Sequence, residues 1–544
     1  MSDGLNVSDQ IETIAPLCKM KPSATCTIAA ISLFIFFCSS VSAQETRAVT
    51  STESASNRST PADATSATVD TYIAEQLATE RIPGLALGVV RDGKLIKAQG
   101  FGLANIELFV PVSPETVFQT GSVGKQFTAA AVMMLVQEGK IGLDDKISKY
   151  LAGTPEKWKD VTVRNLLTHT SGIADYANDE NLKHSGPINL RQDYTEDELF
   201  QKFTTLPMDF KPGEKWSYSN TGYVLLGILI HKVTGEFYGD FLHERLFRPL
   251  GMNSTRIISE ADTIPNRSAG YELVNGVIKN QQWVSPTLNT TADGALYTNV
   301  LDIAKWDAAL YTEQLLKKSS LEQMWTPVTL TDREQHPYGF GWDLAEVNGH
   351  RMIEHGGAWQ GFTAHISRYL DDRLTVIVLT NLDADHSRAD VIAHTVAAKY
   401  LPDVGASALK PIEDKEPQVT ALVRTTLADL ATGHVNVDSF PLNQREHWVA
   451  ERIRGLSKVL QQAGSLKSIE LLERKSDGTM NLYKYLAVFA ERNMIINLIL
   501  DSNGRISGLQ IRSQEVGLQC LGCKASPDTR LAVDSRKPKP IMSR

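Results

Sequence analysis

Cysteine is scarce in this chain of 544 residues, and its placement excludes a disulfide scaffold. Three of the five cysteines, Cys18, Cys26 and Cys38, lie near the beginning of the chain. The other two, Cys520 and Cys523, form one Cys-x-x-Cys pair in a polar stretch near its end. Such a pair supplies at most two metal ligands, and we interpret it as a plain tail or a local disulfide. The long segment between these two groups must therefore fold around a hydrophobic core.

An excess of positive charge is also lacking. The chain has 55 basic and 63 acidic residues, a formal net charge of −8. Nucleic-acid-binding proteins present basic faces, so we expect no nucleic-acid partner. The composition, 42% hydrophobic and 22% charged, is that of a globular protein, and the length predicts two or three domains.

Several hydrolase and nucleotide-binding motifs are missing. The chain contains no Gly-x-Ser-x-Gly nucleophile elbow and no His-Glu-x-x-His zinc motif. A phosphate loop is excluded at Gly124-Lys125, because Gln119 occupies the position of its first glycine and Gln126 that of its Ser or Thr. The sequence therefore predicts neither an α/β-hydrolase, nor a zinc peptidase, nor an ATPase.

No apolar run reaches the roughly 20 residues that span a bilayer. The longest candidate, Ile28–Phe37, follows Lys19 and Lys21 and precedes small residues that end at Ala43. This order is typical of a secretory signal cleaved near Ala43, and Met20 is a possible true start. We therefore predict an exported protein (periplasmic or extracellular) with no stable transmembrane segment after cleavage. The alternative is a retained N-terminal membrane anchor.

The rest of the chain divides by composition. Residues 44–66 are rich in Ser, Thr and Ala and are expected to be a flexible linker. We predict a main domain over 67–405, a small α+β accessory domain over 412–514 and a tail over 515–544.

Periodicity predicts an α+β fold for the main domain. Residues 84–102 indicate a hairpin around an Asp-Gly turn, and 127–138 indicate a helix. Two further strands are expected at 362–370 and 373–381, followed by a helix over 389–400. We infer an antiparallel sheet flanked by helices, with a mostly helical second lobe. For the accessory domain we expect helices at 418–432 and 443–463 and strands at 467–474, 479–488, 491–500 and 505–512.

A serine and a lysine three residues apart stand at the start of the helix expected after residue 121. Ser122 and Lys125 would share one face of a helical turn, within hydrogen-bond reach. A serine hydroxyl becomes a good nucleophile when a neighbouring base takes its proton. A four-residue match of this kind also arises by chance, so its context decides.

The context supplies two more polar clusters. Tyr218-Ser219-Asn220 precedes an apolar helix, and a phenol and an amide two residues apart can both face a cleft. His355-Gly356-Gly357 stands at the edge of an expected strand, where paired glycines allow a substrate backbone to approach. Tyr-x-Asn also occurs at 176–178 and 297–299, which we interpret as loop residues, with a place in the cleft lining as the alternative for Tyr297.

With these motifs in order, the chain resembles the serine β-lactamase and penicillin-binding family, nearest its class C and esterase/D-peptidase branch. The phrases HTSGI (169–173), FKPGEKWSYSNTGY (210–223), ADGALYTNVLDIAKW (292–306) and YGFGW (338–342) carry the resemblance, which covers about residues 68–400. It implies the β-lactamase/transpeptidase fold and acyl transfer through an acyl-enzyme.

The resemblance also implies roles for individual residues. Ser122 would be the nucleophile, and Lys125 and Tyr218 would share the proton transfers. Asn220 would orient the substrate and Lys125, and the backbone N–H of Ala358 would join that of Ser122 in the oxyanion hole. Which of Lys125 and Tyr218 is the general base stays open, because coupled groups titrate as a unit.

The third motif departs from the family's usual Lys-Thr-Gly. His355 is mostly neutral at pH 7 unless its surroundings change its pKa, so it lacks the fixed charge that holds a substrate carboxylate. This favours an esterase or peptidase over an efficient β-lactamase. We interpret His169 in the HTSGI phrase as a structural residue that holds a loop.

The predicted substrate is a small molecule or short peptide: a D-amino-acid peptide, a short ester or a β-lactam. No metal or cofactor is expected, and the oligomeric state stays open. Two alternatives remain: a penicillin-binding-type sensor that is acylated with little turnover, and a non-catalytic scaffold.

Overall fold

The computed structural model describes residues 61–177, 188–405, 410–440, 450–476 and 480–513. The predicted signal segment, most of the linker and the Cys520/Cys523 pair lie outside these residues. Among the described residues, no helix has both the length and the apolar character needed to cross a bilayer.

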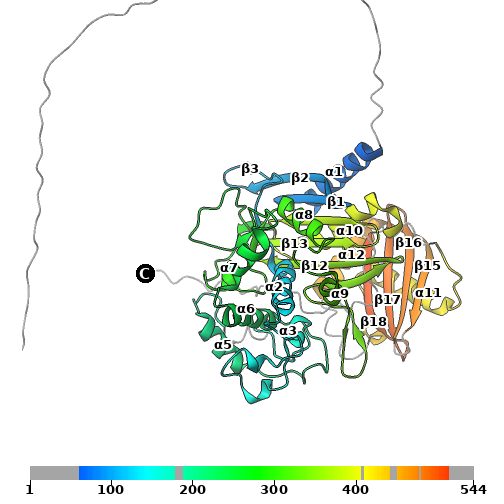
Figure 1. The fold of residues 1–544 in the computed structure, drawn as a ribbon. Coiled ribbons are helices and arrows are strands. Elements are labelled where there is room, and N and C mark those ends of the chain that lie inside the picture. Colours follow the sequence, from blue (N-terminus) through cyan, green and yellow to red (C-terminus); the bar gives the residue numbers. More distant parts are fainter. Residues whose placement is uncertain (1–60, 178–187, 406–409, 441–449, 477–479, 514–544) are drawn as a thin grey trace, which may run out of the picture. The chain divides into compact units, whose positions relative to one another are not determined.

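A seven-stranded antiparallel sheet organises the main domain (Figure 1). Its order is β11-β12-β13-β14-β1-β2-β3, so the N-terminal hairpin pairs with strands from far along the chain through β1 and β14. The strands are β1 (Gly84–Arg91), β2 (Lys94–Asn105), β3 (Val110–Pro111), β11 (Asp343–Val347), β12 (His350–Trp359), β13 (Phe362–Tyr369) and β14 (Leu374–Thr380).

The predicted hairpin is confirmed. Arg91 pairs with Lys94, which leaves a two-residue turn at Asp92-Gly93. Both turn residues have positive φ, +52° and +72°, as a type I′ turn requires.

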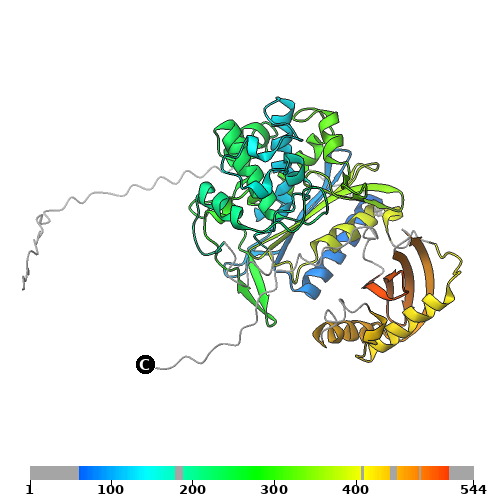
Figure 2. The ribbon, with the colours of Figure 1, turned by 90° about the horizontal axis from the view of Figure 1, so that it is seen from below.

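Both faces of the sheet are covered. Leu85, Leu87 and Val89 of β1 face one core, together with α1 (Pro61–Glu80) and α10 (Ala389–Tyr400). Ala86 and Val90 face the other core, which holds the helices of the second lobe. Side chains alternate along a strand, so a strand buried on both faces reads as a continuous apolar run. In Figure 2, α1 and α10 lie side by side beneath the sheet.

The second lobe is mostly helical, as predicted. Its helices and those that follow it are α2 (Lys125–Gln137), α3 (Val163–Leu167), α5 (Glu196–Thr205), α6 (Asn220–Thr234), α7 (Tyr238–Leu242), α8 (Val300–Ala309) and α9 (Lys318–Met324). The small strands are β4 (Phe118–Gln119), β5 (Arg256–Ile257), β6 (Tyr271–Val274), β7 (Val277–Asn280), β8 (Leu296–Thr298), β9 (Val328–Thr329) and β10 (Gln335–His336).

The predicted α+β module follows the main domain. Its four strands form an antiparallel sheet in chain order, and they pack with the two helices around a hydrophobic core of their own. The elements are α11 (Pro417–Ala431), α12 (Ala450–Ala463), β15 (Leu466–Ser476), β16 (Met480–Phe489), β17 (Asn493–Asp501) and β18 (Ile506–Ser513).

The boundary between the expected linker and the main domain differs from the prediction. Helix α1 begins at Pro61, so residues 61–66 are helical rather than part of the expected linker. The prediction rested on their Ser/Thr/Ala content. Pro61 stands at the first helical position, where its missing N–H costs nothing.

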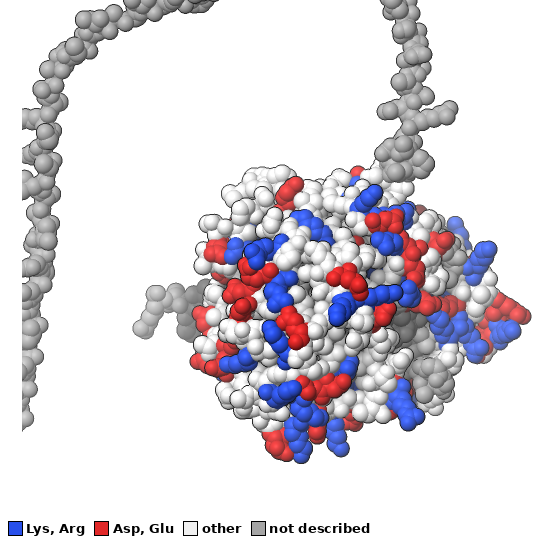
Figure 3. Space-filling model, viewed as in Figure 1, with Lys and Arg blue, Asp and Glu red and all other residues white. Residues whose placement is uncertain are grey.

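On the face drawn in Figure 3, acidic and basic side chains are interspersed.

Candidate active site

Ser122 and Lys125 occupy a tight turn that runs directly into α2. Gly121–Gly124 form a 3-10 turn and Lys125 is the first residue of the helix. Residues three apart eclipse each other in a 3-10 turn, which brings the two side chains together. Lys125 is fully buried, and its Nζ donates to Ser122 Oγ at 2.9 Å, Asn220 Oδ1 at 2.7 Å and the Asp293 carbonyl at 2.6 Å.

Burial lowers the pKa of Lys125 to about 8, while the carboxylates of Asp293 and Asp175 act in the opposite direction. A free lysine titrates near pH 10.4, so burial makes the neutral amine far more accessible here. The nitrogen that contacts Ser122 can therefore act as a base near neutral pH.

Asn220 is held in one orientation by the residues around it. It begins α6, and the preceding residue, Ser219, caps that helix by accepting from Gly222 N–H. The backbone N–H and the Nδ2 of Asn220 donate to the two carboxylate oxygens of Asp175, at 3.0 and 3.1 Å. Its Oδ1 is thereby turned toward Lys125.

Tyr218 lies over the lysine. Lys125 Nζ is 4.8 Å from the centre of its ring, which packs on His169 with 4.3 Å between ring centres. Burial raises the pKa of Tyr218 well above its usual value, with Ser122 opposing the rise. The buried hydroxyl makes no hydrogen bond of standard geometry to any described residue.

Strand β12 passes against the turn that carries Ser122. A Cβ on Gly357 would stand 2.0 Å from the Thr120 carbonyl and 2.8 Å from Ser122 N. Gly121 has φ of +52°, and a Cβ on it would stand 2.4 Å from the backbone N of Ala358. The two glycines thus bring the backbone of Ala358 beside Ser122, as the predicted oxyanion hole requires.

His355 belongs to a chain of four hydrogen bonds. Ser219 N–H donates to His169 Nδ1 at 3.1 Å, and His169 Nε2 contacts Tyr338 Oη at 3.1 Å. Tyr338 Oη contacts His355 Nε2 at 3.0 Å, and His355 Nδ1 contacts the Gly356 carbonyl at 2.5 Å.

The ends of this chain fix its direction. A backbone N–H can only donate, so His169 Nδ1 accepts and its Nε2 carries the hydrogen that goes to Tyr338. Tyr338 then donates to His355 Nε2, and His355 Nδ1–H donates to the carbonyl of Gly356. Both imidazoles are neutral in this arrangement, and both nitrogens of each ring are engaged.

The electrostatic surroundings agree with neutral rings. Burial, followed by the charge of Lys125, lowers the pKa of His355 to about 3 and that of His169 well below its usual value. The expected orienting residue His355 is thus inside the site, but its ring contacts protein groups.

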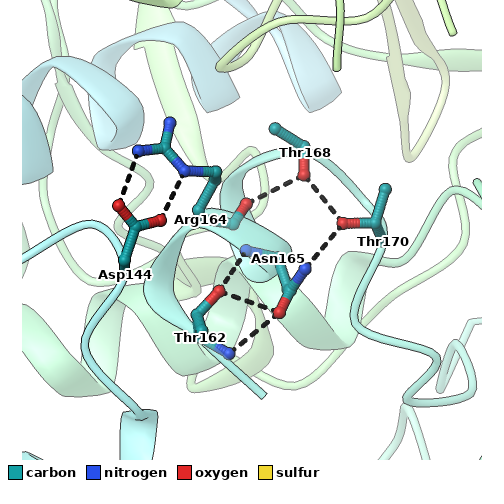
Figure 4. Close-up of polar contacts among 6 residues, drawn as sticks. All are labelled: Asp144, Thr162, Arg164, Asn165, Thr168 and Thr170. Atoms are coloured by element: carbon teal, nitrogen blue, oxygen red, sulfur yellow. Dashed lines mark hydrogen bonds and ion pairs between the residues drawn. The ribbon is translucent and has the colours of Figure 1, made fainter. Parts of the chain in front are cut away.

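The loop that carries His169 is anchored through α3, as Figure 4 shows. Thr162 and Asn165 form a reciprocal capping box at the start of the helix, and Asn165 Nδ2 donates to Thr170 Oγ1 at 3.0 Å. His169 adopts φ of +58°, and its carbonyl accepts from Ser217 N–H at 3.0 Å. His169 therefore contacts the 217–219 loop through both its backbone and its ring.

With this geometry in view, comparison with known proteins decides the family. Residues 69–401 match the family described as Beta-lactamase. The chain belongs to the Beta-lactamase family. It is a serine hydrolase of that family, related to penicillin-binding proteins, and the predicted fold class is confirmed.

Relatives of this Beta-lactamase-family hydrolase include peptide-processing and penicillin-binding proteins. A penicillin-binding protein of Bacillus subtilis (strain 168) is 33% identical over 54% of this chain and 67% of its own. A D-aminopeptidase of Gluconobacter oxydans (strain 621H) is 27% identical over 71% of each chain.

A solved structure, the octameric penicillin-binding protein homologue from Pyrococcus abyssi, is 25% identical with a TM-score of 0.55. It covers 82% of this chain and all of its own. Because residues 69–401 are only about three fifths of the chain, this likeness extends outside the matched region.

Sequence reasoning missed three residues of this hydrolase's site: Asp175, Asp293 and Tyr338. Asp175 orients Asn220, and Asp293 offers its carbonyl to Lys125 while its carboxylate accepts from Tyr176 Oη at 2.9 Å. Tyr338 links the two histidines. Each is far along the chain from its partner, so no local spacing marks it. Tyr176, which the sequence analysis interpreted as a loop residue, thus contacts the site through Asp293.

Proposed function

We propose that this protein is an acyl-transfer hydrolase that cleaves an amide or ester through an acyl-enzyme on Ser122. One observation carries the proposal: the fully buried Lys125 Nζ, with its pKa lowered to about 8, lies 2.9 Å from Ser122 Oγ. A serine gains nucleophilic power from such a base.

Lys125 is the better candidate for the base. Its pKa is about 8, whereas the pKa of Tyr218 is raised well above the ordinary value for a phenol. Lys125 therefore reaches its basic form at lower pH, and Tyr218 stays protonated and able to donate.

The proposed reaction has two steps. Ser122 Oγ bonds the substrate carbonyl carbon as its proton passes to Lys125, and the oxyanion is held by the backbone N–H groups of Ser122 and Ala358. The carbon–nitrogen or carbon–oxygen bond then breaks, and Tyr218 gives the leaving group its proton. Lys125 passes the proton it took from Ser122 to Tyr218, which restores both groups. In the second step the oxygen of a water molecule bonds the acyl carbon while its proton passes to Lys125, the bond to Ser122 Oγ breaks, and Lys125 returns the proton to Oγ; no cofactor takes part.

The charges around Ser122 favour substrates without a carboxylate next to the scissile bond. His355 is neutral, with both ring nitrogens engaged, and therefore offers no cation. Asp175 and Asp293 add negative charge near Lys125. We propose D-aminoacyl amides, D-aminoacyl peptides or short esters as the substrate class, in line with the D-aminopeptidase relative.

A substrate panel tests this choice. D-alanine p-nitroanilide, its L isomer, p-nitrophenyl acetate and nitrocefin are compared on the wild-type chain and on Ser122→Ala. We expect turnover of the D-anilide or the ester at least tenfold above nitrocefin, and none with Ser122→Ala. Faster turnover of nitrocefin would refute the substrate class, and activity that survives in Ser122→Ala would refute the nucleophile.

A second candidate is a penicillin-binding sensor that is acylated but hardly deacylates, and the 33% identity to a penicillin-binding protein favours it. Stopped-flow kinetics with nitrocefin separate the two, because a sensor gives a burst of one equivalent followed by negligible turnover.

We further propose that the protein acts after export, with its leader removed near Ala43. N-terminal sequencing of the secreted or periplasmic chain tests this, since a start at Gln44 is expected and an intact N-terminus would contradict it.

A further inference from the structure

We propose that Glu354, His365 and His394 form a binding site for one divalent transition-metal ion such as Zn²⁺, behind the strand that carries His355. The three ligand atoms lie within 4.8 Å of one another. They come from β12, β13 and α10, so the fold rather than a local motif brings them together.

Both imidazoles direct Nε2 at one carboxylate oxygen. Glu354 Oε2 lies 2.9 Å from His365 Nε2 and 2.5 Å from His394 Nε2. Two histidines and one carboxylate are a common donor set for zinc and related ions. Around a tetrahedral zinc ion, donor atoms stand about 3.4 Å apart. Small side-chain rotations would therefore let one ion replace the protons between these atoms, with water completing its coordination.

The cluster faces away from Ser122. A Cβ on Gly356 would approach His365 Nδ1 at 3.4 Å, whereas one on Gly357 would meet Ser122 N. Alternate residues of a strand point to opposite faces, so Glu354 shares the face of Gly356 and His355 shares that of Gly357. The proposed ion therefore takes no part in the acyl transfer.

The site is enclosed but reachable. The side chains of His394, His365 and Glu354 are 1%, 7% and 15% exposed, so the carboxylate end is the route by which an ion would enter. Enclosure on the histidine side restricts the water that would compete for the ion.

Surrounding carboxylates favour a cation. Asp343 lies directly across from Glu354 in the β11–β12 register. Asp390, one helical turn before His394, shares its charge with Arg388, which it contacts at 3.2 Å. A dication held by Glu354 would add positive charge beside these acidic residues.

A bound ion would tie α10 and β13 to β12 one residue from His355. Its expected effect is to stiffen the strand that positions Gly357 and Ala358.

Metal titration of the full chain tests the proposal. Cys520→Ser/Cys523→Ser is used as the background, because that pair could bind zinc independently. After chelator treatment, Zn²⁺ is titrated against a chromophoric competitor, and Co²⁺ is added separately to record its ligand-field spectrum. We expect one ion per chain, a tetrahedral Co²⁺ spectrum and a raised melting temperature.

Three variants, Glu354→Gln, His365→Gln and His394→Gln, should each weaken zinc binding at least 100-fold. His386→Gln is the matched control, since it removes an exposed histidine that contacts Asp383 at 2.8 Å and should leave binding unchanged. Circular dichroism without metal shows whether each variant folds.

Titration of the chain with the cluster intact decides the question even if a variant does not fold. Binding of less than one ion per chain at 100 µM Zn²⁺, or a Co²⁺ spectrum of octahedral aqua type, would overturn the proposal. The cluster would then be a hydrogen-bonded ion group only.

Discussion

Lys125 makes three hydrogen bonds from one buried nitrogen, and this explains why its protonation should govern the rate. With a pKa of about 8, the amine is mostly protonated at pH 7 and mostly neutral at pH 9. The base must be neutral to accept the Ser122 proton. The acylation rate should therefore rise with pH through about 8 and then level off.

Pre-steady-state acylation measured between pH 5.5 and 10 checks this dependence. Lys125→Arg, which stays charged, should lose about 10²–10⁴-fold in rate. A pH-independent wild-type rate, or a rise centred near the free-lysine value, would mean that burial does not lower the pKa of Lys125 as described.

Tyr338 donates to the neutral ring of His355, whose pKa is already lowered by burial and by the charge of Lys125. In Tyr338→Phe, His355 Nε2 loses its donor and His169 Nε2–H loses its acceptor. The pKa of His355 should therefore rise, and stability should fall by about 1–3 kcal/mol. Histidine ring resonances followed by NMR over pH 3–8 would show the change.

Tyr238→Phe is the matched control for Tyr338→Phe. Tyr238 is 3% exposed, and its hydroxyl has no hydrogen bond to any described residue. An unchanged His355 titration in Tyr338→Phe would show that the hydrogen-bond chain does not set the protonation state.

The residues of the site were predictable where chemistry marks them locally. Ser122 and Lys125 stand three residues apart, and Tyr218 and Asn220 stand two residues apart before a helix. Asp175 and Tyr338 belong to no such short motif. Asp175 contacts Asn220, 45 residues away, and Tyr338 contacts His355, 17 residues away. The sequence predicted that His355 lies in the site. Its hydrogen bond to Tyr338 is a tertiary contact that the sequence could not show.

At the scale of elements, the approach of β12 to the turn that carries Ser122 depends on Gly357. Gly357→Ala would force a Cβ to within 2.0 Å of the Thr120 carbonyl, so β12 or the turn must move. A displacement of about 1 Å costs on the order of 100-fold in rate, and we expect a loss of that size in the acylation rate.

The neighbouring glycine gives a matched control. In Gly356→Ala the added Cβ meets only ordinary contacts, the nearest being His365 Nδ1 at 3.4 Å, so the rate should stay within about threefold of wild type. Equal losses in the two variants would contradict the close packing on the Ser122 side.

Elements with strong periodicity were predicted closely. The helix expected over 389–400 is α10, and the strand expected over 373–381 is β14, Leu374–Thr380. The helix expected from Phe127 begins two residues earlier, at Lys125. Its first turn lacks apolar periodicity, so the periodicity alone placed the start of the helix two residues too late.

For the whole molecule, the pairing of β1 with β14 joins the first and last strands of the main domain in one sheet. The elements α11, α12 and β15–β18 pack around a separate hydrophobic core. The groups that accept hydrogen bonds from Lys125 Nζ, on Ser122, Asn220 and Asp293, all belong to the main domain. A chain truncated after Lys410 should therefore still be labelled at Ser122. A truncated chain that is folded by circular dichroism but unlabelled would show that the C-terminal module contributes to the site.

The central claim is that Ser122 forms a covalent acyl-enzyme, and one measurement tests it most directly. The purified chain is treated with a fluorophosphonate, and the modified peptide is located by tandem mass spectrometry. We predict one adduct per chain, on Ser122, with none in Ser122→Ala and slow labelling in Lys125→Arg. An adduct on another residue, or equal labelling of Ser122→Ala, would contradict the account.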